Sequence, residues 1–534
     1  NIMTLDTDKP YVQALVVVDG IIKYIGSKDI AMKFKGEKTK ILDYGEATIY
    51  PGFMDAHTHG PMAGQRLAFQ ADLTAEHSMS AYVEKMAEYV KKNPDRKVIM
   101  GAGWSKYDEP TAAMLDAICP DKPMILRSID GHSVWCNTAA IKYCSIDKNY
   151  VEQFGTARVH VDAEGNPSGL FVEEAASLII DKFKVTKEEM KEGLLAWQEF
   201  AFSQGITAVA EAYLDMYPET PEAYAELVEE GKWKLRTYAY NINVNTVRTD
   251  PFKIGSVLRE MADKYDSEYF KVLGQKMILD GVVEGHTAAM VDEYADQPGY
   301  HGVINLDNQK ALEIVVESAN EAGFPVHTHA IGDLASNMMS DAYKTVALKT
   351  GNFDARNALC HLQIVSPETI QKCGDYNIIA VVAPTWAPVL MPYFNDSIKY
   401  LGEKRAWEQY PIKAFEDAGA TLCFHTDYPV NTIMSVPLSV YTAVKRARPL
   451  NDPDGGPKSV NNPDEAISAL RALLAMTINV AYMCKQENHL GTLAIGKVAN
   501  AAVYTKDFIT CDYKEIMDAQ LVATIVDGEE VYKA

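Results

Sequence analysis

Short hydrophobic runs alternate with longer amphipathic stretches along most of the chain. The short runs have the length of buried strands, and the amphipathic stretches have the length of helices. This alternation is typical of repeated βα units around a parallel sheet. Strands are predicted at residues 49–55, 206–212, 235–240, 275–280, 324–328, 358–363, 378–383 and 421–426. Eight such strands favour an α/β barrel.

Two helices and one insertion are predicted from the same pattern. Residues 309–322 form an amphipathic stretch that Gly323 ends, and residues 463–476 begin with the acidic residues that suit a first helical turn. About 150 residues separate the first two predicted strands, far more than one βα unit needs. We therefore expect an inserted subdomain at about residues 66–186.

The two ends of the chain have strand patterns of their own. Residues 15–18 and 21–25 flank Asp19-Gly20, a strong hairpin signal. A similar pattern of strand-forming residues occurs near the C-terminus, at residues 501–504, 524–526 and 530–532. We expect residues 1–50 and 485–534 to form one small β-domain beside a barrel of residues 51–484.

Composition and charge narrow the class of protein. The 534 residues are 47% hydrophobic and 23% charged, as in ordinary globular proteins, and the formal net charge is −22. This charge disfavours non-specific attraction to nucleic acids or to anionic membranes. A small-molecule substrate is the expected partner, and a homo-oligomer is compatible with the sequence.

The cysteines and the N-terminal residues bear on the cellular compartment. Eight scattered cysteines form no C-x-x-C pair, which favours reduced thiols. No stretch of 18 apolar residues occurs, and the first ten residues lack the pattern of a secretion signal. We expect a cytoplasmic protein without a membrane span.

Two H-x-H pairs lie at the ends of predicted strands. His57 and His59 follow an apolar strand with a Pro51-Gly52 turn, and His327 and His329 lie at the end of the strand predicted at residues 324–328. Because side chains alternate along a strand, each pair could point to one metal site. A single pair also occurs by chance or on surfaces, so the repetition carries the argument.

His361 and Asp427 also end strand-like runs. Alone, His361 could be a hydrogen-bonded core histidine, and Asp427 a turn or helix-capping residue. As one ordered set at strand ends, these residues predict a metal site. Lys276 lies within an apolar strand, where it is either a solvated edge lysine or a buried amine with a lowered pKa that could take up carbon dioxide.

With these residues in this order, the sequence resembles the metal-dependent amidohydrolase superfamily, in the branch of N-substituted formamide deformylase-like proteins (amidohydrolase family 3). The resemblance covers nearly the whole chain. The matching segments are residues 51–59, 130–133, 276–281, 287–289, 329–333, His361, residues 427–430 and residues 491–500.

The resemblance implies a distorted (β/α)8 TIM barrel with a β-sandwich built from both chain ends. It also implies two divalent ions, commonly zinc. Carried onto this chain, His57, His59 and Asp427 would bind one ion, His329 and His361 the other, and N6-carboxylated Lys276 would bridge them. His327 remains an alternative to His329.

Other residues are candidates for substrate contacts. His132 could polarise a substrate carbonyl or serve as a structural histidine, and Trp104, Tyr107 and Trp386 could form an aromatic wall or fill a core. His286 stands where the family often has arginine, so it could contact substrate. His425-Thr426 precede Asp427 where Gly-Ser is frequent, so the pocket lining is expected to differ.

The expected reaction is hydrolysis by a metal-activated water, with Asp427 as the proton acceptor and donor. The leading substrate class is a linear amide, formamide or N-acyl amine, whose carbon–nitrogen bond is cleaved. An ester, lactone or cyclic amide is the alternative for the same site. A binding module without catalysis is the third hypothesis, and the full ligand set argues against it.

Overall fold

The computed structural model describes residues 1–105, 109–128, 133–180, 182–183, 185–391 and 393–534. The chain forms two compact units. One comprises Asn1–Gly60 and Gln198–Ala534, and the other comprises Pro61–Trp197. The segment expected as an insertion, residues 66–186, lies within the second unit, and the predicted domain boundaries stay predictions.

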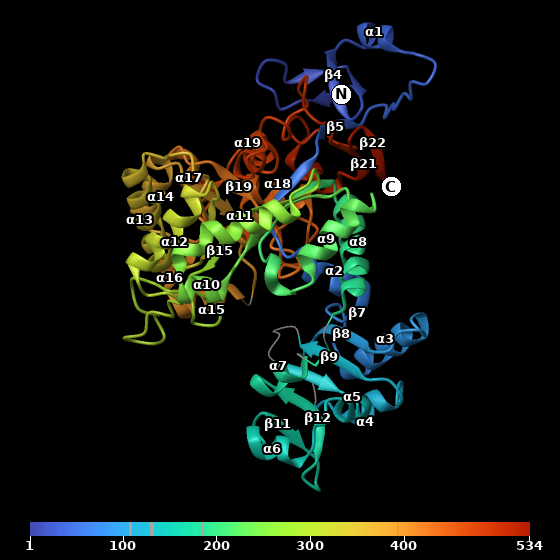
Figure 1. The fold of residues 1–534 in the computed structure, drawn as a ribbon, viewed down its shortest axis with the longest axis vertical. Coiled ribbons are helices and arrows are strands. Elements are labelled where there is room, and N and C mark those ends of the chain that lie inside the picture. Colours follow the sequence, from blue (N-terminus) through green and yellow to red (C-terminus); the bar gives the residue numbers. More distant parts are fainter. Residues whose placement is uncertain (106–108, 129–132, 181, 184, 392) are drawn as a thin grey trace. The chain divides into compact units, whose positions relative to one another are not determined.

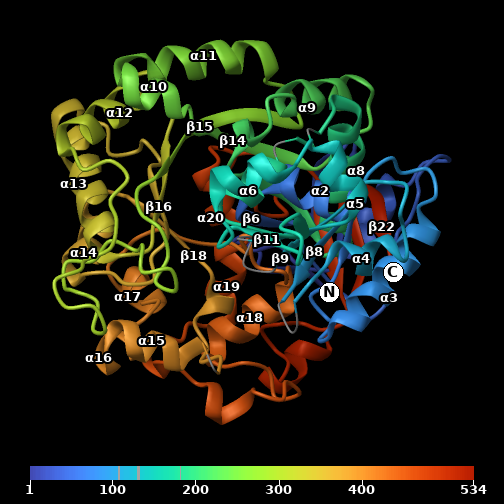
Figure 2. The same ribbon diagram turned by 90° about the horizontal axis from the view of Figure 1, so that it is seen from below.

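The first unit contains a parallel sheet of eight strands, and each predicted run contributes one of them (Figure 2). The strands, in chain order, are β6 (Phe53–Thr58), β13 (Ile206–Glu211), β14 (Arg236–Asn241), β15 (Phe270–Ile278), β16 (Val326–Ala330), β17 (Ala358–His361), β18 (Ile379–Val382) and β19 (Leu422–Phe424). Neighbours in the sheet are also neighbours in this chain order. The predicted α/β barrel is confirmed.

Hydrogen bonds between the segment after β19 and strand β6 close the barrel. The Asp427 N–H donates to the His57 carbonyl over 3.1 Å, and the His59 N–H donates to the Tyr428 carbonyl over 2.9 Å. Small and medium side chains fill the interior below these bonds, among them Ala56, Ala208, Ala210, Ala358, Cys360, Val381 and Cys423. The polar strand ends therefore rest on an apolar core.

Helices cover the outside of the barrel and connect its strands, as Figure 2 shows for the yellow and green part of the chain. They include α9 (Thr220–Glu229), α11 (Ile254–Tyr265), α12 (Gln309–Glu321), α13 (Asp333–Thr350), α14 (Pro367–Asp375), α17 (Ile412–Asp417), α18 (Val436–Lys445) and α19 (Ala469–Ala475). Helix α20 (Ile478–Met483) instead packs against the apolar cluster of the barrel interior. The prediction for residues 309–322 is confirmed by α12.

The single helix predicted at residues 463–476 is wrong. Residues 463–465 form one 3-10 turn, and α19 begins only at Ala469. Ser468 caps α19 by accepting a hydrogen bond from the Arg471 N–H. Because the capping serine has an extended backbone, the chain cannot continue as one helix through this position.

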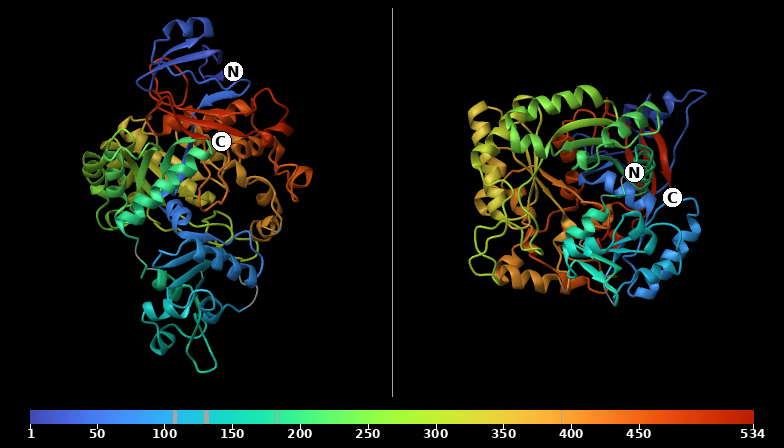
Figure 3. Two further views of the ribbon diagram at one scale, coloured as in Figure 1. Left: turned by 90° about the vertical axis from the view of Figure 1, so that its right-hand side faces the viewer. Right: turned by 60° about the horizontal axis from the view of Figure 1, so that its bottom comes forward.

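Both ends of the chain contribute to one six-stranded sheet in the first unit (Figure 3). Its order is β2 (Tyr11–Val12), β1 (Ile2–Met3), β5 (Thr48–Pro51), β20 (Ala501–Tyr504), β21 (Leu521–Val526) and β22 (Glu529–Lys533). The predicted N-terminal hairpin forms a separate sheet of β3 (Ala14–Val18) and β4 (Ile21–Gly26). Strands from both termini thus form a small additional domain.

The second unit contains a mixed sheet with helices beside it (Figure 1). Its strands are β7 (Gln70–Asp72), β8 (Ile99–Trp104), β9 (Met124–Ser128), β10 (Ser133–Cys136), β11 (Val159–Val161) and β12 (Pro167–Val172). Its helices include α3 (Met79–Lys92), α4 (Ala112–Asp116), α5 (Thr138–Tyr143), α6 (Lys148–Phe154) and α7 (Glu174–Ile180). Among the described helices, none combines the length and apolar character needed to cross a membrane.

Candidate metal centre

The polar residues of the candidate site lie at the carboxyl ends of the barrel strands. In β6, three residue steps from Asp55 to Thr58 stand opposite two steps from Val209 to Glu211 in β13. Such a bulge re-aims the side chains that follow it. This explains why His57 joins the site although Ala56, the residue before it, faces the barrel core.

His57, His59 and Asp427 form the first group of donor atoms. The Asp427 Oδ1 atom is 3.4 Å from His57 Nε2 and 3.1 Å from His59 Nε2. Ligand atoms of all three residues lie within 4.8 Å of one another. Asp427 adopts a left-handed backbone conformation with φ of 60°, which is uncommon for a residue other than glycine. The sequence prediction placed these three residues on one ion, and the structure brings them together.

Lys276 reaches the same group from β15. Its Nζ atom is 3.4 Å from His57 Nε2, and the residue is only 2% exposed. Burial lowers the pKa of its ammonium group, because removal from water disfavours the charged form. The solvated edge position considered for Lys276 therefore does not describe this structure.

His329 and His361 lie next to each other beside the first group. Their ring centres are 4.5 Å apart, and the His361 ring is 4.9 Å from the His57 ring. Asp280 fixes His329, because its Oδ1 atom lies 3.1 Å from His329 Nδ1. Because Asp280 contacts Nδ1 of His329, Nε2 is the ring nitrogen that can bind a ligand.

His327, the alternative to His329, has a different environment. Its Nε2 atom lies 2.8 Å from Nδ1 of His57, and its ring packs 4.8 Å from that of Tyr240. It is fully buried. His327 therefore contacts the Nδ1 atom of His57, whereas His329 lies beside His361 and is held there by Asp280.

Burial determines the charge of the histidines. It lowers the pKa of His57, His327 and His361 well below the ordinary value, so these rings are neutral at pH 7. Asp427 differs, because contact with His59 and nearby positive charge outweigh its burial and lower the pKa of the carboxyl group. Neutral imidazoles and an ionised carboxylate are the forms that bind divalent metals.

Three buried carboxylic acids support the site, and the sequence analysis assigned no role to them. Asp55 accepts hydrogen bonds from the backbone N–H groups of His57 and Thr426. Glu211 accepts from the Gly60 N–H over 2.5 Å and from the Tyr213 N–H over 2.9 Å.

The third, Asp280, accepts four hydrogen bonds, from His329 and from the N–H groups of Ala289, Ile331 and Gly332. Burial raises the pKa of Asp55 and of Glu211 to about 7. Each acid stands at the end of an apolar strand run, a signal that could have identified them.

Trp386 and His425 extend the site. The Trp386 ring stacks on His361 at 5.6 Å with an interplanar angle of 11°, and it meets His425 edge-on at 5.5 Å. His425 is 2% exposed, and neither of its ring nitrogens has a hydrogen-bond partner among the described residues. Burial lowers its pKa to about 4. The sequence analysis noted His425 only as a change in the family pattern.

Two other predicted substrate contacts, His286 and Trp104, have local partners of their own. His286 Nε2 is 3.1 Å from both carboxylate oxygens of Asp296, and its ring packs against Tyr294 and Tyr400. Trp104 is 1% exposed in the core of the second unit, with its indole N–H bonded to the Leu126 carbonyl over 2.8 Å. This environment matches the core alternative for Trp104.

Tyr107, a predicted substrate contact, and His132, the predicted catalytic residue that would polarise the substrate carbonyl, lie outside the described residues.

The donor set fits a metal ion. In addition to the group of His57, His59 and Asp427, the Nδ1 atoms of His59 and His361 are buried without a hydrogen-bond partner in the described part of the chain. Unpartnered buried imidazole nitrogens are costly unless they bind something. Imidazoles and carboxylates together are ligands that divalent zinc accepts.

Comparison with known proteins agrees with this geometry. The model of the amidohydrolase family matches residues 40–532. The putative amidohydrolase YtcJ of Bacillus subtilis is 26% identical, with 98% of this chain and 96% of YtcJ covered. The N-substituted formamide deformylase of Arthrobacter pascens is 23% identical, with 99% of this chain and 96% of that protein covered.

A solved structure is also similar in fold. An uncharacterized metal-dependent hydrolase from Pyrococcus horikoshii superimposes with a TM-score of 0.75 at 21% identity, covering 96% of this chain and 97% of that one. The chain belongs to the amidohydrolase family. It is a metal-dependent hydrolase of the class that acts on carbon–nitrogen bonds other than peptide bonds.

Proposed function

We propose that this enzyme hydrolyses the carbon–nitrogen bond of a linear amide, a formamide or an N-acyl amine. The observation that supports the proposal most strongly is the convergence of His57, His59, Lys276 and Asp427 at the barrel strand ends. The N-substituted formamide deformylase acts on substrates of this type, as its name states.

The proposal includes two divalent ions, with zinc as the expected metal. His57, His59 and Asp427 would hold one ion, and His329 and His361 would hold the other. When bound, such ions polarise a carbonyl group and lower the pKa of a water molecule.

Lys276 would bridge the two sets of ligands as its N6-carboxylated form. Two observations support this role: the amine is buried, and it lies 3.4 Å from His57 Nε2. A lysine gains the required negative charge only by carboxylation. Because burial lowers its pKa, a larger fraction of the amine is neutral and able to react with carbon dioxide.

Asp427 would move the proton during hydrolysis. Its ionised carboxylate would accept a proton from the attacking water and would then donate it to the departing nitrogen. Its carboxylate is ionised at neutral pH, which is the form that a proton acceptor requires.

Trp386 would supply an aromatic wall for the substrate. Its ring is already stacked on His361, so a flat or apolar substrate group beside it would lie close to the metal ligands.

The eight free cysteines also support the expected cytoplasmic location, because reduced thiols persist there.

Steady-state kinetics on matched substrates test the proposed reaction. Formamides and N-acyl amines should have the highest kcat/KM among amides, esters, lactones and phosphoesters that carry the same apolar group. A higher kcat/KM for the ester or the lactone of a matched pair would show that the proposed substrate class is wrong. Asp427→Asn should lower kcat by roughly 10²–10⁴-fold, the usual contribution of general acid–base catalysis. Wild-type turnover by the metallated Asn variant would remove Asp427 from the proton transfer.

A further inference from the structure

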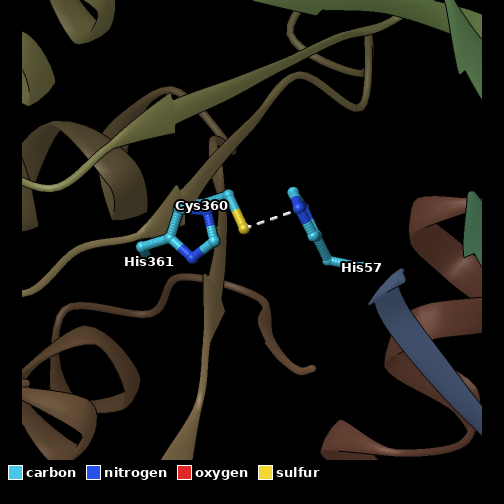
Figure 4. A group of neighbouring side chains, drawn as sticks. All are labelled: His57, Cys360 and His361. Carbon is cyan, nitrogen blue, oxygen red and sulfur yellow. Dashed lines mark hydrogen bonds between the residues drawn. The ribbon is translucent and has the colours of Figure 1, made fainter. Parts of the chain in front are cut away.

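One buried side chain beside the proposed ligands has no part in the reaction above. Cys360, in β17, points into the barrel interior together with Ala358. Its Sγ atom is 3.1 Å from Nδ1 of His57 (Figure 4). Ligand atoms of His57, Cys360 and His361 all lie within 4.8 Å of one another, and each residue is at most 2% exposed.

The two ring nitrogens of His57 serve different groups of neighbours. Nε2 is 3.4 Å from Asp427 Oδ1 and 3.4 Å from Lys276 Nζ. Nδ1 is 3.1 Å from Cys360 Sγ and 2.8 Å from His327 Nε2. The proposed hydrolytic site uses the first group, so the donors around Nδ1 form a second set on the other side of the same ring.

We propose that Cys360, His57 Nδ1 and His361 form a second metal site that prefers soft ions. Thiolate ligands select zinc, cadmium or cuprous ions over magnesium or manganese, and one thiolate with imidazoles is a usual zinc ligand set. Nδ1 of His361 is buried and has no hydrogen-bond partner in the described part of the chain, so this nitrogen can accept a ligand.

The observed spacing is close to that of a bound ion. Zn–S and Zn–N bonds of about 2.3 Å and 2.0 Å place the donor atoms of a tetrahedral ion about 3.5 Å apart. The distance of 3.1 Å from Cys360 Sγ to His57 Nδ1 is shorter by a few tenths of an ångström. For this pair of atoms, a shift of a few tenths of an ångström would therefore reach the spacing of bound ligands.

Binding would proceed with a simple charge balance. The Cys360 thiol loses its proton to solvent as the sulfur–metal bond forms, and no electron is transferred. A divalent cation supplies the positive charge that stabilises the buried thiolate.

Occupation of this site would interfere with hydrolysis. His57 and His361 belong to both ligand sets, so an ion on the Cys360 side draws them away from the geometry that the reaction needs. This consequence rests on the proposed function, whereas binding of the ion does not. We therefore expect soft ions in excess to inhibit the enzyme more strongly than manganese does.

Cadmium is the probe for the test, because a sulfur–cadmium bond has its own ultraviolet charge-transfer band. Purified full-length protein is titrated with Cd²⁺ as wild type, as Cys360→Ser and as the matched control Cys423→Ser. Cys423 is likewise fully buried in the barrel core. We expect a sulfur band that saturates in wild type and in the control. In Cys360→Ser, that component should vanish and the affinity for Cd²⁺ should fall at least about tenfold.

The outcomes separate the two proposals. An unchanged sulfur band in Cys360→Ser, or the absence of any such band in an active wild-type enzyme, overturns the second site and leaves the proposed function intact. A Cys360-dependent band in a protein that hydrolyses no amide supports the site and overturns the proposed function. If Cys360→Ser does not fold, X-ray absorption of the cadmium-loaded wild type decides: nitrogen and oxygen neighbours without sulfur would overturn the proposal.

Discussion

Replacement of Asp280 by asparagine tests how the structure holds His329. Asp280 is 1% exposed, and each of its carboxylate oxygens accepts two hydrogen bonds. Oδ1 is paired with His329 Nδ1 at 3.1 Å and with the Ile331 N–H at 3.0 Å. Oδ2 accepts from the Ala289 N–H at 3.0 Å and from the Gly332 N–H at 2.8 Å. The carboxylate thus fixes two loops and one candidate ligand.

The expected loss of stability follows from the number of hydrogen bonds that Asp280 accepts. An asparagine side chain keeps one acceptor oxygen, and its NH2 group faces either the N–H groups of Ala289 and Gly332 or, if it is turned, the Ile331 N–H and the donor tautomer of His329. Two hydrogen bonds to a charged group are lost, at roughly 1.5–3 kcal/mol each. We therefore expect Asp280→Asn to lower the free energy of unfolding by about 3–6 kcal/mol.

Thermal unfolding of the metal-free protein measures this loss. With an unfolding entropy of about 2.1 cal/mol/K per residue and a unit of about 400 residues (1–60 and 198–534), the midpoint should fall by roughly 4–7 °C. Asp333→Asn is the control, because the oxygen it keeps can still accept the Val291 N–H. Equal midpoints for wild type and Asp280→Asn would refute this reasoning.

Three further substitutions have defined outcomes. Lys276→Ala should abolish activity, with partial recovery in short carboxylic acids, and mass spectrometry that shows an uncarboxylated lysine in the active wild type would contradict the role. Trp386→Ala should raise KM for aromatic substrates more than for small ones, and equal changes would remove the aromatic wall. Arg236→Leu should lower the free energy of unfolding by up to about 3 kcal/mol, because it breaks the ion pair at 2.7 Å between the buried Arg236 and the partly exposed Asp527. The ion pair between the exposed Arg471 and Glu416 is the control in denaturant unfolding, with an expected loss below about 1 kcal/mol for Arg471→Leu.

Local patterns were sufficient to predict the barrel, because each strand is a short apolar run between polar segments. They were not sufficient for boundaries that depend on distant contacts. The run at residues 49–55 is divided between β5 and β6, and Gly52 stands at the division. A Cβ atom at Gly52 would lie 2.2 Å from Thr207 Oγ1, a residue more than 150 positions away. No local pattern contains that contact.

The site was predictable to a similar extent. The strand-end positions of His57, His59, His361 and Asp427 followed from the pattern, and the structure brings these residues together. The contact of Cys360 with His57 could not be predicted, because it depends on which side chains of β6 and β17 face each other across the barrel. The bulge in β6 that redirects His57 is equally invisible in a period-two pattern.

The most direct test of the central claim is to measure bound metal and amide hydrolysis together in one set of variants. His57→Ala and His59→Ala remove ligands of the proposed first ion, and His489→Ala removes an exposed histidine as the control. We predict that both site variants lose metal and activity in parallel while the control keeps both. Full metal occupancy with wild-type turnover in His57→Ala and His59→Ala would contradict the account.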